Sequence, residues 1–159
     1  MQCTQRHLQH LQQFLKSSSL VHIKLKKNYP QAPIIITGHS LGGALATLQA
    51  VDIKAQIPDF SIKLVTFGSP KVGNSQFSNY ANDFLKNDSI RITNIKDIIP
   101  HLLFKFFDFY HTGQEIWFLD NVSVKTDCNQ GEDQNCSASF YPNLSVSDHL
   151  NYFEVYWLH

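Results

Sequence analysis

The fold of this chain is decided by the stretch Ile34-Ile35-Ile36-Thr37-Gly38-His39-Ser40-Leu41-Gly42-Gly43-Ala44. A β-branched run leads into Gly-x-Ser-x-Gly and a helix-forming segment follows, which is the sequence form of a nucleophile elbow. The run that begins at Ile34 predicts a strand buried on both faces, as in a parallel sheet. We expect Gly38 and Gly42 because the tight turn leaves no room for Cβ atoms there. The small residues after Gly42 let the helix lie close to the strand.

Ser40 is the candidate nucleophile of this turn. In an elbow its Oγ points out of the sheet above the N-terminus of the following helix. The backbone N–H of Leu41 faces the same spot, where it can donate to an oxyanion. A glycine-rich turn between a strand and a helix is the alternative interpretation. The strand before Ser40 and the helix after it are the context that the motif requires, and they favour the nucleophile.

Length and charge limit the class of protein. A chain of 159 residues predicts one domain, and 43% hydrophobic residues suffice for a core. The 13 basic and 13 acidic residues balance, so neither nucleic acid nor an anionic membrane is indicated as a partner. No apolar run reaches the roughly 18 residues that indicate a transmembrane helix. The segment Met1–His10 is polar, so it does not predict a signal peptide.

Strands and helices are expected to alternate along the chain. We expect strands over residues 34–37, 61–67 and 89–95, helices over 4–28, 44–56 and 75–85, a hairpin or strand pair over 114–119 and 122–125, and a last helix or helical turn over 147–156. This alternation predicts an α/β fold with a mainly parallel sheet. In such sheets the reactive groups gather at the carboxyl ends of the strands, where Ser40 and Asp97 both fall.

A serine nucleophile needs a base and a group that orients the base. In the chain order of α/β-hydrolases the acid follows the serine and the histidine comes last, which selects Asp97 and His149. Three histidines outside this selection are His39, His101 and His111. The first is adjacent to the serine and is expected to point elsewhere on the elbow. The other two follow Asp97 and compete with His149 as the base.

Cys128 and Cys136 lie in a short polar loop, far along the chain from Cys3. We favour a local disulfide between the two, which fits an oxidising compartment. A metal site is disfavoured, because the spacing lacks a second pair of ligands. The acidic residues of the loop would suit calcium, but a solvated loop is favoured.

Five blocks of sequence occur in order along the chain. They are Gly38-His39-Ser40-Leu41-Gly42-Gly43-Ala44, Thr66-Phe67-Gly68-Ser69-Pro70-Lys71-Val72-Gly73, Asn94-x-x-Asp97-Ile98-Ile99-Pro100-His101, Tyr110-His111-x-Gly113-Gln114-Glu115-Ile116-Trp117 and Asp148-His149-x-x-Tyr152-Phe153. Together they resemble the fungal-type, class 3 lipases of the α/β-hydrolase fold. The resemblance extends from about Val21 to Phe153.

The resemblance implies a function and a role for each residue. Ser40 would be the nucleophile, Asp97 the acid and His149 the base, whereas His111 matches a structural histidine. The implied reaction is the hydrolysis of lipid carboxylic esters of the triacylglycerol type through an acyl-enzyme, with no metal or cofactor. The implied substrate lies at an oil–water or membrane surface, and the implied location is extracellular. The loop of Cys128 resembles one that holds a disulfide in many members.

Similar enzymes carry a long segment before the helix that precedes the elbow. It holds the first strands, a lid helix, a secretion signal and a second oxyanion donor, so Leu41 is the oxyanion donor that this sequence identifies. We therefore expect residues 1–159 to form a single truncated lipase-like domain, the C-terminal portion of the fold. The strand 34–37 would then be an edge with bare apolar faces. A catalytically impaired fragment that acts as a binding or interaction protein is the alternative function.

Overall fold

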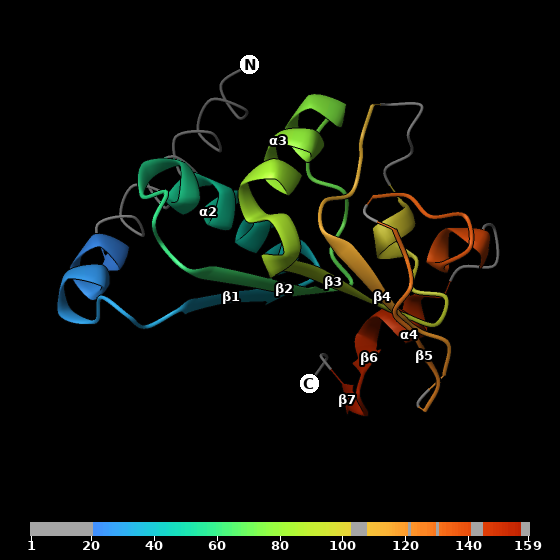
Figure 1. Ribbon diagram of the computed structural model, residues 1–159. Coiled ribbons are helices and arrows are strands. Elements are labelled where there is room, and N and C mark those ends of the chain that lie inside the picture. Colours follow the sequence, from blue (N-terminus) through green and yellow to red (C-terminus); the bar gives the residue numbers. More distant parts are fainter. Residues whose placement is uncertain (1–20, 103–107, 121, 130, 141–144, 157–159) are drawn as a thin grey trace, which may run out of the picture.

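A five-stranded sheet forms the centre of the molecule (Figure 1). The computed structural model describes residues 21–102, 108–120, 122–129, 131–140 and 145–156. The strands are β1 (Ile34–His39), β2 (Ile62–Phe67), β3 (Ser89–Asn94), β4 (Gln114–Phe118) and β5 (Val124–Lys125), in the order β1-β2-β3-β4-β5. The first four are parallel and β5 runs antiparallel to β4. The predicted α/β class, with a mainly parallel sheet and a terminal hairpin, is confirmed.

Two helices cover one side of the sheet, α2 (Leu41–Gln56) and α3 (Ser75–Leu85) (Figure 1). The core between them and the sheet includes Ile36, Ala50 and Leu64, all buried. α2 begins three residues earlier than the sequence suggested, because Ser40 itself is the N-cap and the glycines after Leu41 are already helical. The elbow therefore joins strand to helix with no intervening loop.

β1 differs from its predicted burial. Ile36 faces the helices and is 7% exposed, whereas Ile35 on the opposite face is 66% exposed. Within the described part of the chain β1 pairs only with β2, so it is an edge strand. The prediction of a strand buried on both faces is wrong for this chain, because no described element covers Ile35. Of the expected edge with bare apolar faces, the edge position and the bare face at Ile35 are observed among the described residues, whereas the face at Ile36 is covered.

The C-terminal segment, predicted as a last helix or helical turn over residues 147–156, begins with that turn but does not stay helical to its end. The helix α4 (Val146–Leu150) is short, and the hairpin of β6 (Asn151–Tyr152) and β7 (Val155–Tyr156) follows it. Phe153 and Glu154 both have positive φ, 56° and 62°, which are the values of a two-residue hairpin turn. In Figure 1 this hairpin lies on the side of the sheet opposite α2 and α3.

Shorter elements complete the described chain. The 3₁₀ turns are η1 (Lys86–Asp88), η2 (Ile99–His101) and η4 (Ser137–Phe140), and residues 21–28 are helical. The rest of the predicted N-terminal helix, residues 4–20, lies outside the described residues. No helix among those residues has the length and apolar character needed to cross a bilayer.

The loop after β5 is closed by a disulfide between Cys128 and Cys136, as predicted, with Cα atoms 6.0 Å apart. Both cysteines pack with Trp117 of β4 in a small buried cluster. The Trp117 indole N–H donates to the Ile95 carbonyl at 2.9 Å. The disulfide therefore holds the loop against the far end of the sheet from β1.

Candidate active site

Ser40 occupies a strained turn at the carboxyl end of β1. Its φ of 56° and ψ of −129° are a conformation that residues with a side chain rarely adopt, as a nucleophile elbow requires. Its own N–H donates to the Phe67 carbonyl at 2.9 Å, which ties the elbow to the end of β2. A Cβ on Gly38 would lie 2.2 Å from the Gly42 carbonyl oxygen, so the turn needs a glycine at this position.

The other glycine of the motif has a different status. A Cβ on Gly42 would meet no atom within 4 Å, so the expectation of a steric need there is wrong. The reason is that this residue already lies in α2, on the side away from the strand. Gly43 does need its small size, because a Cβ there would lie 2.8 Å from Cβ of Ser69.

Asp97 lies just beyond β3 and is completely buried. Its Oδ1 accepts a hydrogen bond from the backbone N–H of Ile99 at 2.8 Å. Its Oδ2 accepts from the Tyr152 hydroxyl at 2.6 Å and lies 3.0 Å from Nδ1 of His149. Three donors thus orient one carboxylate, and two of them come from the C-terminal segment.

His149 connects the acid to the serine. Its Nε2 lies 2.9 Å from Ser40 Oγ, and its Nδ1 is hydrogen-bonded to the Asp97 carboxylate. Because the carboxylate can only accept, Nδ1 carries the proton and Nε2 is the acceptor for the Ser40 hydroxyl. The structure therefore brings together the three residues that chain order selected, although 109 positions separate His149 from Ser40.

The short helix α4 that carries His149 is fastened at both ends. Ser145 caps its N-terminus, because the side-chain oxygen accepts from the Asp148 N–H at 3.1 Å. The Lys96 N–H donates to the Asp148 carboxylate at 3.1 Å, and Nδ2 of Asn94 donates to the Asn151 carbonyl at 2.7 Å. The end of β3 and the loop after it thus position His149 as well as Asp97.

Two residues of the site were not identified from the sequence as parts of it. The Tyr152 hydroxyl is buried against Asp97, and burial together with that negative charge raises the pKa of this phenol well above 10. It therefore stays a donor at neutral pH. Gly68 has a φ of 55°, and a Cβ there would lie 2.5 Å from Asp97 Oδ2. Their signals were the spacing Asp148-His149-x-x-Tyr152 and the glycine that ends β2.

The two competing histidines occupy other places. His111 is buried with its Nε2 2.8 Å from the Pro100 carbonyl, and desolvation lowers the pKa of its imidazole well below 6.5. Desolvation also lowers the pKa of His101, in the turn η2. Neither is bonded to Ser40. His39 does not point elsewhere, as the sequence suggested, because its Nε2 lies 2.9 Å from the His149 carbonyl.

The oxyanion position predicted at Leu41 is at the N-terminus of α2. The first N–H groups of a helix have no acceptor within the helix, so this N–H can serve an external anion. The Leu41 side chain itself is 68% exposed. At this position the group that can bind an oxyanion is therefore the backbone N–H and not the side chain.

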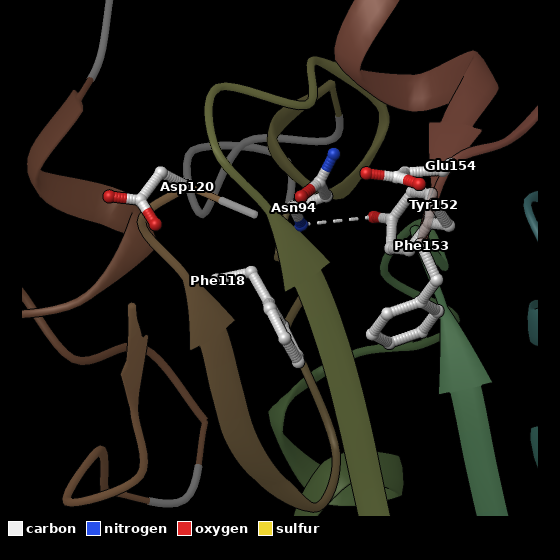
Figure 2. A pocket seen from close by; sticks show the side chains of 6 residues that line it. All are labelled: Asn94, Phe118, Asp120, Tyr152, Phe153 and Glu154. Atoms are coloured by element: carbon white, nitrogen blue, oxygen red, sulfur yellow. Dashed lines mark hydrogen bonds between the residues drawn. The ribbon is translucent and has the colours of Figure 1, made fainter. Parts of the chain in front are cut away.

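A pocket of about 210 Å³ adjoins the acid (Figure 2). Phe118 and Phe153 form its apolar walls, with ring centroids 5.0 Å apart, and Tyr152 separates it from Asp97. The carboxylates of Asp120 and Glu154 lie at its rim in the figure. Ser40 does not line this pocket, so the pocket is distinct from the space in front of the serine hydroxyl.

One group of potential metal ligands occurs among the described residues, formed by Glu115, Cys128 and Cys136. Both sulfurs are committed to the disulfide. The thiolate form that binds metals is therefore absent from this group.

Comparisons with known proteins agree with this geometry. The family described as Lipase (class 3) matches residues 8–107. A lipase of Rhizomucor miehei is 39% identical over 137 residues, which cover 81% of this chain and 37% of that protein. A crystal structure of a Rhizopus microsporus var. chinensis lipase superposes with a TM-score of 0.87 at 31% identity, over 94% of this chain and 53% of that one.

A third relative bears on the catalytic groups. It is a triacylglycerol lipase whose catalytic centre is a serine protease triad, with a TM-score of 0.82 and 37% identity. The match covers 87% of this chain and 54% of that one. These neighbours have the α/β-hydrolase fold. The chain spans about half the length of the solved lipases that it matches, and the sheet and helices described above are a part of that fold.

Proposed function

We propose, from the premise that this chain belongs to the class 3 lipase family, that its site hydrolyses carboxylic esters of lipids through an acyl-enzyme on Ser40. The observation that carries the proposal is the continuous relay from Asp97 Oδ2 through His149 to Ser40 Oγ, with steps of 3.0 and 2.9 Å. Nucleophile, base and orienting acid are the groups that acyl transfer by serine requires.

The reaction follows from the protonation states in the relay. His149 Nε2 accepts the Ser40 proton as Oγ attacks the ester carbonyl, and the negative charge moves to the carbonyl oxygen. The Leu41 N–H stabilises that charge, and Asp97 stabilises the imidazolium. The imidazolium then protonates the leaving alcohol, and the C–O bond breaks to leave the acyl-enzyme. Water, deprotonated by His149, releases the acid and restores Ser40. All of these steps use groups of the protein and water.

Family membership and the named relatives support a lipid ester of the triacylglycerol type as the substrate class, presented at an oil–water or membrane surface. The Cys128–Cys136 disulfide supports an extracellular location for the full-length form, because disulfides persist in oxidising compartments. These statements concern the whole protein.

A second candidate function rests on β1. The exposed face at Ile35 and the unpaired edge of β1 favour an interaction protein in which the site is impaired. The two functions differ in one respect that can be measured, which is whether Ser40 reacts with an acyl-like electrophile.

The test is labelling of the folded chain with a serine-directed fluorophosphonate, followed by peptide mapping. We expect a single labelled residue, Ser40, and loss of labelling in Ser40→Ala and in His149→Gln. Hydrolysis of p-nitrophenyl butyrate should fall with it, by about 10⁴-fold or more. Labelling that persists in Ser40→Ala contradicts the proposal, and a folded parent chain that is not labelled favours the interaction protein.

A further inference from the structure

The residue next to the nucleophile makes three contacts with the machinery of the base. The His39 ring stacks on the His149 ring, with centroids 4.5 Å apart and planes inclined by 27°. Its Nε2 lies 2.9 Å from the carbonyl oxygen of the same residue. Its edge meets the Tyr152 ring at 5.4 Å. His39 therefore touches both residues that approach Asp97 from the C-terminal segment.

The contact with the carbonyl defines the tautomer of His39. A carbonyl oxygen can only accept a hydrogen bond, so Nε2 of His39 carries a proton, and this N–H donates a hydrogen bond to the backbone carbonyl of His149. That carbonyl lies near the C-terminus of α4, where the last carbonyl groups of a helix have no N–H donor within the helix. His39 consequently supplies a donor that the short helix lacks.

The position of His39 in the chain gives this hydrogen bond a mechanical meaning. His39 and Ser40 are consecutive at the end of β1, whereas His149 arrives on a five-residue helix from the other end of the sequence. At the carboxyl end of β1, His39 thus contacts the backbone of His149, and the next residue, Ser40, contacts its Nε2. The ring of His149 is hydrogen-bonded to Asp97 and Ser40, and His39 adds an attachment to its backbone.

We propose that His39 is a positioning residue for the base: its Nε2–H and its ring hold His149 at the distance and angle at which it accepts the Ser40 proton. This inference rests on the proposed function for its kinetic meaning. The Ser40–His149 distance tests its structural content independently of any activity.

The protonation state of His39 affects how it can position His149. The groups that face His39 are the His149 ring and backbone, the Asp97 carboxylate and the Tyr152 ring. Burial, more than any of these, lowers the pKa of His39, so the ring is neutral at pH 7. A protonated His39 would place a cation against the ring that must itself become an imidazolium in the reaction. Protonation of His39 should therefore contribute to the fall in rate on the acid side of the pH profile.

Three variants separate the donor from the ring. His39→Gln keeps an N–H donor for the His149 carbonyl and removes the titrating ring, His39→Phe keeps an aromatic ring and removes the donor, and His22→Gln is the control. His22 lies in the helical segment 21–28, before β1 and at the opposite end of that strand from Ser40. Each protein is tested for folding by thermal melting before its rates are measured.

The kinetic readout is the second-order rate constant of fluorophosphonate labelling between pH 4 and pH 8, together with kcat and KM for p-nitrophenyl butyrate. We expect His39→Phe to lower the labelling rate and kcat by about 10- to 100-fold with an unchanged KM, because a misplaced base affects the transition state. His39→Gln should stay within about fivefold of the parent at pH 7. Its rate should also fall less than the parent's as the pH is lowered, because the titrating ring of His39 is gone.

The structural readout is a crystal structure of each variant. We expect the Ser40 Oγ–His149 Nε2 distance to stay near the parent's 2.9 Å in His39→Gln and to exceed hydrogen-bond reach in His39→Phe. Parental rates and a parental distance in His39→Phe would overturn the inference, as would equal damage in both variants. If the parent itself is not labelled, the proposed function fails, and the two distances still decide whether His39 positions His149.

Discussion

The carboxyl end of β1 and the outward face of the same strand are covered very differently. At the carboxyl end, the Ser40 hydroxyl is hydrogen-bonded to His149, and the backbone N–H of Ser40 is hydrogen-bonded to the end of β2. Only a few residues earlier, Ile35 is 66% exposed beside Lys63 of β2, with no described element over it. The six-residue strand β1 therefore has hydrogen-bonded neighbours at its carboxyl end and an open face at Ile35.

This difference shows that the site and the open face depend on different contacts. The site is built by hydrogen bonds from the loop after β3 and from α4, all within the described chain. The open face would need apolar cover from outside those residues. Substitutions at the first region should therefore change chemistry, whereas substitutions at the second should change association. The substitutions at Asp97 and at Ile35 below test this separation.

The largest effect is expected at the acid. Asp97→Asn places an amide N–H against Nδ1 of His149, which favours the wrong tautomer, and kcat for p-nitrophenyl butyrate should fall by about 10⁴-fold. Tyr152→Phe removes one of the three donors to the same carboxylate and should lower kcat by about tenfold. A loss smaller than tenfold in Asp97→Asn, with the fold retained, would show that this carboxylate does not orient the base.

The next effect is on stability, and two glycines of one motif provide the contrast. Gly38→Ala drives a Cβ into the backbone of Gly42 and should destabilise the fold by about 1–3 kcal/mol or more, as overpacking does. Gly42→Ala meets no atom within 4 Å and should stabilise the helix by about 0.5–1 kcal/mol. Urea unfolding measures both values. Equal destabilisation by the two substitutions would contradict the close approach of Gly38 to the backbone of Gly42.

The third effect is a pH dependence at His111. Because burial lowers the pKa of this imidazole well below 6.5, the unfolded chain binds a proton below pH 6.5 that the native chain does not. Stability is therefore retained above that pH and lost as the pH falls toward the native pKa, by up to about 1.4 kcal/mol per pH unit. His111→Gln should show a flatter decline between pH 6.5 and pH 5 in urea unfolding. Parallel declines would assign the pH dependence to other groups.

The smallest effect on stability is expected at the open face. Ile35→Lys should change the free energy of unfolding by no more than about 0.5 kcal/mol, while reducing self-association through the β1 edge. Ile36→Val, on the buried face of the same strand, should destabilise by about 0.5–1.5 kcal/mol without affecting association. Sedimentation velocity measures association. A parent chain that is monomeric at all concentrations would show that this edge is not adhesive.

The sequence predicted most of the fold because its elements carry local signals. The runs that form β2 and β3 are rich in β-branched residues, and α3 begins at Ser75 and ends at Leu85 as its spacing indicated. The C-terminal helical turn is present as α4, but its predicted extent to residue 156 is wrong, because no glycine marks the positive φ of Phe153 and Glu154 in the hairpin that follows. The order Ser40, Asp97, His149 came from chain position, and their catalytic roles stay predictions until the variants are measured.

By itself, the sequence determined the elbow, since the steric limits of Gly38 and Gly43 act between near neighbours on the chain. It also determined the disulfide, because Cys128 and Cys136 share one short loop. Only the tertiary structure decided which face of β1 stays open in the described chain and that His39 turns toward His149. These contacts join residues up to 110 positions apart. No local pattern encodes such pairs, because their distance depends on how the sheet and α4 pack.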